Sequence, residues 1–327
     1  MHRCDETATC KKLLTRLILL ARDVITQPAP ALSVTDARIA YGAVQALQGV
    51  SLDVHGGEVL GLLGPNGAGK TSLLQCLAGR RKLDSGEIRC SFAGDFESII
   101  GIVPQEIAVY RDLSVEQNLS VFARFQGIDK SEIRDVVHEA IEWAQLSEKR
   151  RALAGGLSGG MQRRLNIASS VMHRPQILLL DEPTVGVDPQ SRERIYEMLA
   201  GLLDAGTAML LTTHHLEEAQ ERCDRIAIID QGKIVDCGSF EELLSRTIGT
   251  AQYVRVQFTA PQSRVPAPLQ LAKSGLEATC PIEDVTTQLP SLLTRIRAAR
   301  LPLEDLSLRS PTLQHMFLHL TGKELRE

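Results

Sequence analysis

The stretch Gly64-Pro65-Asn66-Gly67-Ala68-Gly69-Lys70-Thr71 decides the fold of this chain of 327 residues. It has the form GxxxxGK[ST], in which glycines let successive backbone N–H groups face an anion and the lysine adds a mobile positive charge. Residues 58–63 predict a buried strand before it, and residues 71–78 predict a helix after it. Strand, loop and helix in this order are typical of a phosphate-binding loop. We therefore predict that residues 64–72 bind nucleotide phosphates, with Ser72 near the α-phosphate and the Thr71 hydroxyl on Mg²⁺.

Two adjacent carboxylates end a second apolar run. Residues 177–180 are Ile-Leu-Leu-Leu, which predicts a buried strand, and Asp181 and Glu182 follow. Because successive strand residues point to opposite faces, we expect the two acids to have different tasks. Asp181 is the candidate for holding Mg²⁺ through water. Glu182 is the candidate for orienting, and accepting a proton from, the water that attacks the γ-phosphate.

The remaining pattern predicts an α/β fold. Short runs in residues 32–54 indicate an antiparallel β subdomain, whereas strands at 177–180, 208–212 and 226–230 alternate with helices. Such alternation is typical of a mostly parallel sheet covered on both faces. Helical periodicity predicts an inserted α-helical subdomain at about 106–157. We expect an N-terminal extension (1–30), a nucleotide-binding domain (31–245) and a small C-terminal α+β accessory domain (246–327).

Composition limits the class of protein. The net charge of −4 does not indicate a nucleic-acid partner, and seven cysteines without a CxxC pair favour a reducing compartment. No apolar run approaches the roughly 18–20 residues that a membrane span needs. Residues 1–30 are expected to be flexible; the alternative is a short amphipathic helix that touches lipid or a partner.

A third motif, Leu157-Ser158-Gly159-Gly160-Met161, lies before a predicted helix at 162–171. With it, the chain resembles the nucleotide-binding subunits of ATP-binding cassette (ABC) transporters. The resemblance implies a P-loop NTPase (RecA-like) core, and it implies that Ser158, Gly159 and Gly160 cap the γ-phosphate bound by another subunit. Met161 stands where glutamine is commonest in the family. We interpret Arg163-Arg164 as a solvated helix face rather than a nucleic-acid patch.

The family pattern implies four further roles. Tyr41 falls where an aromatic ring stacks on adenine, and Gln105 where a glutamine links Mg²⁺ to the membrane partner. Asp188 falls where an aspartate signals between sites. His214, rather than His215, falls where a histidine touches the γ-phosphate. The resemblance thus implies Lys70, Glu182 and His214 as catalytic residues and Thr71, Gln105 and Asp181 as Mg²⁺ residues.

The resemblance implies that the chain hydrolyses ATP to ADP and phosphate to drive transport. The pore is expected in a separate permease, at the cytoplasmic face of the cell membrane, and a second ATPase subunit, expected to be an identical copy, is needed head to tail. Residues 310–322 resemble the ending of drug and antibiotic exporters of the daunorubicin-resistance type, which implies export of a small or lipophilic compound. The alternatives are an importer, or a soluble ATPase acting on ribosomes or DNA. Tandem cassettes, long coiled coils and zinc sites are typical of those soluble classes, and the sequence shows none of them.

Overall fold

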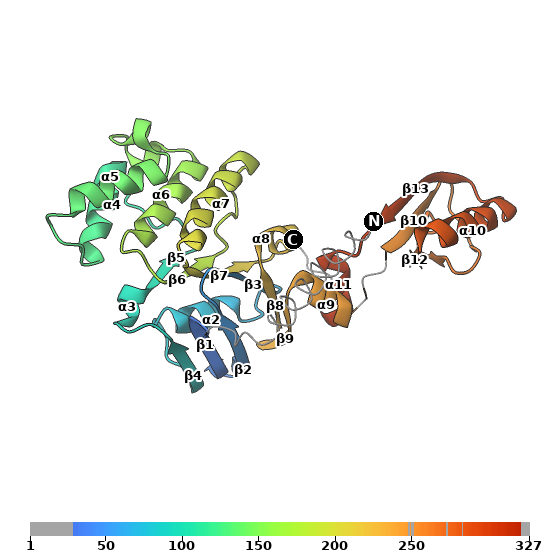
Figure 1. Ribbon diagram of the computed structural model, residues 1–327, viewed down its shortest axis with the longest axis horizontal. Coiled ribbons are helices and arrows are strands. Elements are labelled where there is room, and N and C mark those ends of the chain that lie inside the picture. The colour runs from blue at the N-terminus through green and yellow to red at the C-terminus, as the bar shows by residue number, and fades with distance from the viewer. Residues whose placement is uncertain (1–28, 248, 250–251, 273, 283, 322–327) are drawn as a thin grey trace, which may run out of the picture.

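A six-stranded sheet forms the centre of the computed structural model, which describes residues 29–321 except 248, 250, 251, 273 and 283 (Figure 1). Most of the expected N-terminal extension, residues 1–28, therefore lies outside the described residues. The strand order is β5-β6-β7-β3-β8-β9. In that order, the bounds are Ile100–Val103, Ile177–Asp181, Ala208–Thr213, Val59–Leu63, Arg225–Asp230 and Lys233–Gly238. The first five strands run parallel, and β9 pairs antiparallel with β8. The prediction of a mostly parallel sheet is confirmed.

Strand register places the candidate residues at one edge of this sheet. Leu63, the last residue of β3, pairs with Thr213, and Asp181, the last residue of β6, pairs with Thr212. Val103 at the end of β5 pairs with Leu180. Since parallel strands end on the same side, the segments that follow β3, β5, β6 and β7 meet there.

A three-stranded antiparallel sheet, in the order β2-β1-β4, packs beside the central sheet. Its strands are β1 (Leu32–Tyr41), β2 (Val44–Val54) and β4 (Ser85–Cys90). The sequence predicted the antiparallel strands in 32–54, but not β4. Helix α2 (Lys70–Leu77) follows the phosphate-binding loop and buries Leu73 and Leu77 against apolar residues of both sheets. This packing holds the helix N-terminus at the sheet edge. The short helix α3 (Phe96–Ile99) precedes β5.

The insertion between β5 and β6 is helical, as its periodicity predicts. It contains α4 (Val115–Phe125), α5 (Ile133–Trp143), α6 (Gly159–Val171) and two 3₁₀ turns, Ser147–Lys149 and Ala154–Gly156. Leu119, Val137, Ile141 and Leu165 share one buried core. Helix α7 (Pro189–Asp204) packs on α6 and joins this group of helices to the sheet (Figure 1).

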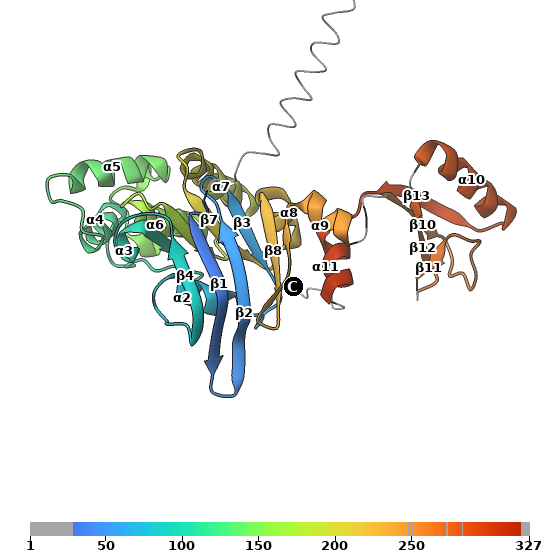
Figure 2. The same ribbon diagram turned by 60° about the horizontal axis from the view of Figure 1, so that its bottom comes forward.

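The C-terminal region forms a separate antiparallel sheet in the order β11-β12-β10-β13, with α10 on one face (Figure 2). These elements span, in chain order, β10 (Gln252–Phe258), β11 (Gln270–Leu271), β12 (Glu277–Ile282), α10 (Val285–Ala298) and β13 (Leu303–Arg309). The last described helix, α11 (Leu313–Thr321), returns to the nucleotide-binding core. It packs on α8 (Leu216–Arg222) and α9 (Phe240–Arg246), where Leu313, Met316 and Phe317 are buried. Helix α11 thus contributes to the core that includes Ile226 and Ile228 of β8.

Candidate functional site

A cavity of about 410 Å³ lies at the edge where β3, β5, β6 and β7 end. Sequence-predicted residues from four separate segments line it: Asn66, Gly67, Gly69, Lys70, Thr71, Ser72, Gln105, Glu182 and His214. Residues of β2 and the loop after β8, among them Ala46, Gln48 and Gln231, complete the wall and were missed in the sequence. Their segments carry no motif, so only their place in the fold brings them here.

The phosphate-binding loop is shaped by backbone that only glycine tolerates. Gly69 caps α2 with φ 108°, and a Cβ there would lie 2.5 Å from the carbonyl oxygen of Ala46. Lys70 is 6% exposed, and its Nζ donates to the carbonyls of Gly64 (2.6 Å) and Pro65 (3.2 Å). Burial lowers the pKa of Lys70, and the charges of Glu182 and Asp181 oppose that shift. A poorly solvated ammonium at a helix N-terminus favours a bound anion.

Glu182 holds together two other predicted residues. Its Oε2 accepts a hydrogen bond from Nε2 of Gln105 at 3.0 Å, and its Oε1 lies 2.9 Å from Nδ1 of His214. The loop after β5, the end of β6 and the end of β7 supply these three side chains. His214 therefore lies at the cavity, whereas His215 is the N-terminal cap residue of α8 and does not line it.

Asp181 and Glu182 have different hydrogen-bond partners, but the alternation of strand residues is not the reason. Strand β6 ends at Asp181, and Glu182 follows it with φ 45°. The alternation of successive strand residues therefore does not apply to Glu182. Asp181 accepts a hydrogen bond from Thr212 Oγ1 at 2.7 Å, while Glu182 N donates to the same hydroxyl at 3.1 Å. Burial raises the pKa of Asp181. Thr212, missed in the sequence, thus orients both residues.

The residues at this edge fit Mg²⁺. No group of three or more His, Cys, Asp or Glu among the described residues could hold a metal ion by itself. Magnesium commonly takes one or two carboxylates and completes its shell with water and substrate phosphates. The Asp181 carboxylate and the Thr71 hydroxyl are hard oxygen donors of that kind. Because Nε2 of Gln105 donates to Glu182, its amide oxygen is the atom that remains for a cation.

Other predicted residues do not line this cavity. Tyr41 is 39% exposed, and the guanidinium carbon of Arg81 lies 4.0 Å from the centroid of its ring. Ser158 caps α6 by accepting from Met161 N (3.3 Å), and Asp188 caps α7 by accepting from Ser191 N (2.9 Å). These two hydrogen bonds hold the helix starts that carry the third motif and Asp188. A single chain does not bring the third motif to its own phosphate-binding loop.

The interpretation of Arg163-Arg164 as a solvated face is wrong, because each side chain is only 2% exposed. Arg163 donates to backbone carbonyls of two segments, among them Pro104 (2.7 Å) and Glu182 (2.7 Å). Arg164 donates to the carbonyls of Ala144 and, at 3.1 Å, Gln145. Burial lowers the pKa of Arg163 to about 10. The sequence pattern did not reveal these acceptors because they lie on other segments of the chain, at residues 104–105, 144–145 and 182–183.

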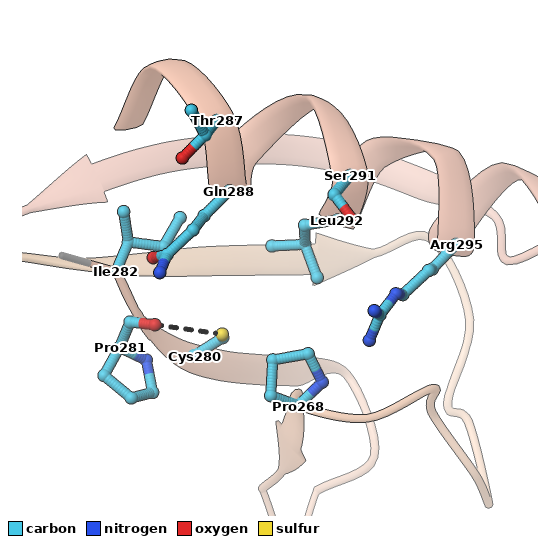
Figure 3. A pocket seen from close by; sticks show the side chains of 9 residues that line it. All are labelled: Pro268, Cys280, Pro281, Ile282, Thr287, Gln288, Ser291, Leu292 and Arg295. Atoms are coloured by element: carbon cyan, nitrogen blue, oxygen red, sulfur yellow. Dashed lines mark hydrogen bonds between the residues drawn. The ribbon is translucent and has the colours of Figure 1, made fainter. Parts of the chain in front are cut away.

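A second cavity, of about 320 Å³, lies between α10 and β12 of the C-terminal region (Figure 3). Cys280, Ile282 and Leu292 form its buried part, and among the described residues of its lining Arg295 alone is charged. Nη1 of Arg295 donates to the carbonyl of Ala267 at 2.9 Å. None of the sequence-predicted site residues lines this cavity. The candidate active site is therefore the cavity at the edge of the central sheet.

Similarity to known proteins agrees with this geometry. Residues 47–185 match the protein family described as ABC transporter. A linearmycin resistance ATP-binding protein of Bacillus subtilis is 36% identical, over 88% of this chain and 97% of that protein. A Nod factor export ATP-binding protein of Ralstonia nicotianae is 36% identical, over 91% and 96%. A daunorubicin resistance ATP-binding protein of Streptomyces coeruleorubidus is 35% identical, over 90% and 97%.

Solved structures have the same core. The cbiO1 structure of Clostridium perfringens, part of an ABC transporter complex, matches with a TM-score of 0.61 at 28% identity, over 67% of this chain and 92% of that one. Another ATP-binding subunit of an ABC transporter matches with a TM-score of 0.60 at 24% identity, over 66% and 92%, which concerns the fold alone. Within the part of the chain that the structure describes, no helix has the length and apolar character of a membrane span.

Proposed function

The chain belongs to the ATP-binding subunits of ABC transporters, and we propose that it drives export of a drug, antibiotic or other lipophilic compound through a separate membrane subunit. ATP is its substrate, and its family couples ATP hydrolysis to transport. The resistance and export functions named for its relatives support the direction and the class of cargo. The observation that carries the proposal is the convergence of Lys70, Gln105, Glu182 and His214 on one cavity.

The phosphate-binding loop and α2 hold the triphosphate. Backbone N–H groups of residues 66–71 face the β- and γ-phosphates, and the N-terminus of α2 adds its partial positive charge. The Lys70 ammonium, which donates to Gly64 and Pro65, exchanges these carbonyls for phosphate oxygens. This exchange replaces weak acceptors with charged ones, so the buried cation favours the bound state.

Thr71, Gln105 and Asp181 are the residues that would hold Mg²⁺. When bound, the ion neutralises developing charge on the phosphate oxygens. The Asp181 carboxylate is oriented for this by the Thr212 hydroxyl at 2.7 Å. Burial, which raises the pKa of Asp181, makes its ionised form costly without a cation nearby.

Glu182 and His214 act on the attacking water. Glu182 accepts a proton from this water while the water oxygen forms a bond to the γ-phosphorus. The bond from that phosphorus to the β–γ bridging oxygen breaks, and ADP leaves with the electron pair. The contact of 2.9 Å between His214 and Glu182 fixes the carboxylate, and Gln105 holds its other oxygen. His214 also donates to the γ-phosphate, so its position depends on whether that group is present.

The third motif completes the site of a second copy of this chain. Ser158 caps α6, whose free N–H groups suit an anion, yet Ser158, Gly159 and Gly160 lie outside the lining of the phosphate cavity. Two copies arranged head to tail bring each motif to the nucleotide of its partner, and Asp188 lies where the halves meet. ATP then stabilises the closed dimer because it binds both halves.

The membrane subunit contacts the segment between Gln105 and the helical insertion. Ile107 (39%) and Tyr110 (47%) are exposed on this segment, and Leu153 (56%) is exposed in the insertion, where it pairs with Ser114. Gln105 lies at the start of this segment and contacts Glu182, so a movement of the segment reaches the hydrolytic residues. The chain works at the cytoplasmic face of the membrane, bound to that partner.

Replacement of Glu182 by glutamine tests the proposal in inside-out membrane vesicles that carry the chain and its permease. We expect phosphate release and ATP-dependent daunorubicin uptake to fall about 10²- to 10⁴-fold, because the proton acceptor is lost. With Mg²⁺ and ATP, the purified variant should elute as a dimer, since it binds ATP without cleaving it.

Glu217→Gln is the matched control, because Glu217 is exposed and lies three residues after His214. It should retain the parental rates. Parental phosphate release by Glu182→Gln would contradict the hydrolytic role. Normal ATP-dependent phosphate release without uptake of daunorubicin or of a panel of lipophilic dyes would contradict export.

A further inference from the structure

The backbone of Glu182 adopts a conformation that L-amino acids rarely take. Its φ is 45°, directly after β6. Residues held in this region persist where the surroundings fix them, and such positions concentrate at functional sites. The N–H of Glu182 donates to the carbonyl (3.2 Å) and the hydroxyl (3.1 Å) of Thr212. The segment Asp181–Thr184 is then held by two buried charged side chains, neither of which touches the phosphate cavity.

Arg163 holds the carbonyls of this segment. Its Nε donates to Pro183 O at 2.5 Å, and its Nη2 donates to Glu182 O at 2.7 Å. Its Nη1 donates to Pro104 O at 2.7 Å and to Gln105 O at 3.0 Å. One planar guanidinium therefore joins the segment that carries Glu182 to the segment that carries Gln105. Arg163 belongs to α6, the helix that begins with the third motif.

The Glu218 carboxylate holds the same segment through the side-chain hydroxyl of Thr184. This carboxylate is 6% exposed and accepts hydrogen bonds from Thr184 Oγ1, Tyr196 OH and Thr213 Oγ1. Thr184 follows Pro183, and Thr213 precedes His214. Three hydroxyl donors from three elements meet on one buried carboxylate, which is the full pairing that a buried polar network requires. Burial and the neighbouring charge of Glu218 raise the pKa of Tyr196, so its phenol stays a donor.

We propose that Arg163 and Glu218 are positioning residues that form a clamp around the segment Asp181–Thr184, keeping Glu182 and His214 in the geometry for hydrolysis. The inference rests on the proposed function, because it assigns the attacking water to Glu182. Arg163 also connects the third motif, which contacts the partner's nucleotide, to the residues that act on the chain's own nucleotide. Closure of one half-site is thereby transmitted to the other.

Steady-state ATP hydrolysis by the purified full chain tests the clamp. We expect Arg163→Met and Glu218→Leu to lower kcat about 10- to 100-fold while KM for ATP, and the affinity for a fluorescent ADP, change less than about twofold. Lysine keeps the charge of Arg163 but not its planar fork, so Arg163→Lys should lose nearly as much as Arg163→Met. Glu218→Gln keeps one acceptor oxygen and should retain more activity than Glu218→Leu.

The neighbouring Arg164 provides the matched control. It is as buried as Arg163, on the same helix, but its acceptors belong to Ala144 and Gln145. Arg164→Met should lower the thermal stability without lowering kcat of the folded protein. Equal losses of kcat in Arg163→Met and Arg164→Met would overturn the clamp, because they would reflect burial alone.

A double-mutant cycle with Glu182→Gln separates the clamp from the proposed function. If the clamp acts through Glu182, then Arg163→Met lowers the residual rate of Glu182→Gln by less than about twofold. Losses that multiply would overturn the clamp and leave the hydrolytic role of Glu182 intact. A parental rate in Glu182→Gln alone would overturn both.

Discussion

His173 is a histidine that the fold keeps poorly solvated just after α6. Its Nε2 lies 3.3 Å from the carbonyl oxygen of Ile100, and its Nδ1 has no hydrogen-bond partner among the described residues. Burial lowers the pKa of His173 below the usual value of 6.5, and the hydrogen bond to Ile100 opposes that shift. In the unfolded chain His173 is not buried, so its pKa is not lowered. The unfolded chain therefore binds a proton at a higher pH than the folded chain does.

We expect this difference to make the protein less stable in mild acid. Between the lowered pKa and about 6.5 the unfolded state binds more protons, so the free energy of unfolding falls as pH falls through that window and is flat above it. The melting temperature of His173→Gln, measured by calorimetry from about pH 7.5 to about pH 5.5, should fall less steeply than that of the parent. His138→Gln is the control, because the side chain of His138 is 56% exposed. Parallel slopes in the parent and His173→Gln would contradict the prediction.

At the scale of elements, the start of α6 packs against the start of α7. A Cβ added to Gly160 would overlap the side chain of Ser191, whereas a Cβ on Gly159 would meet no atom of the described packing neighbours within 4 Å. Both glycines are part of the third motif, and the sequence assigned them the same role. Packing distinguishes them, since Gly160 faces α7 and Gly159 does not.

The two glycines should therefore differ in their effect on stability. Gly160→Ala forces α6 away from α7, and we expect it to lower the free energy of unfolding by about 1–3 kcal/mol. Gly159→Ala should change it by less than about 0.5 kcal/mol. Urea unfolding of the nucleotide-free chain gives both values. Similar values for the two variants would show that the helices tolerate the extra methyl group.

At the scale of the whole molecule, the C-terminal helix α11 belongs to the core that the nucleotide-binding domain uses. Phe317 is 1% exposed in a cluster with Leu63 of β3, Ile226 of β8 and Ala219 of α8. The backbone N–H of Leu313 donates to Oε1 of Gln220 at 3.1 Å, which adds a polar contact between α11 and α8. Because α8 also carries Glu218, helix α11 supports the helix on which the clamp depends.

Removal of the Phe317 ring should destabilise the nucleotide-binding region. We expect Phe317→Ala to cost about 3–5 kcal/mol through the cavity it leaves. Trp143, the single tryptophan, lies in α5 and reports the unfolding of the helical insertion by fluorescence. Gln314→Ala is the control on the exposed side of α11 and should leave the midpoint unchanged. An unchanged Trp143 midpoint in Phe317→Ala would mean that α11 adds little to this core.

Much of the fold and of the candidate site could be predicted from the sequence, because both depend on local patterns. The phosphate-binding loop needs glycines within one turn, and a buried parallel strand such as 177–180 needs only a continuous apolar run. The sequence did not predict the order of the strands, but the alternation of strands and helices predicted a mostly parallel sheet. These signals lie within short windows, so the lining residues Lys70 and Glu182 could be predicted from them, whereas Gln105 and His214 were predicted from the family resemblance.

Contacts between distant segments were decided only by the tertiary structure. Arg163 resembled a solvated charge, but its acceptors at residues 104–105 and 181–183 lie far away in the chain, on segments that meet only when β5 and β6 pair. The roles of Thr212 and Glu218, and the packing of α11 on α8 and α9, were not predicted for the same reason. A buried charge is stable where distant carbonyls or hydroxyls solvate it, and their positions are a property of the packed fold. The sequence by itself determined which chemistry this chain carries, whereas tertiary packing decided which side chains hold that chemistry in place.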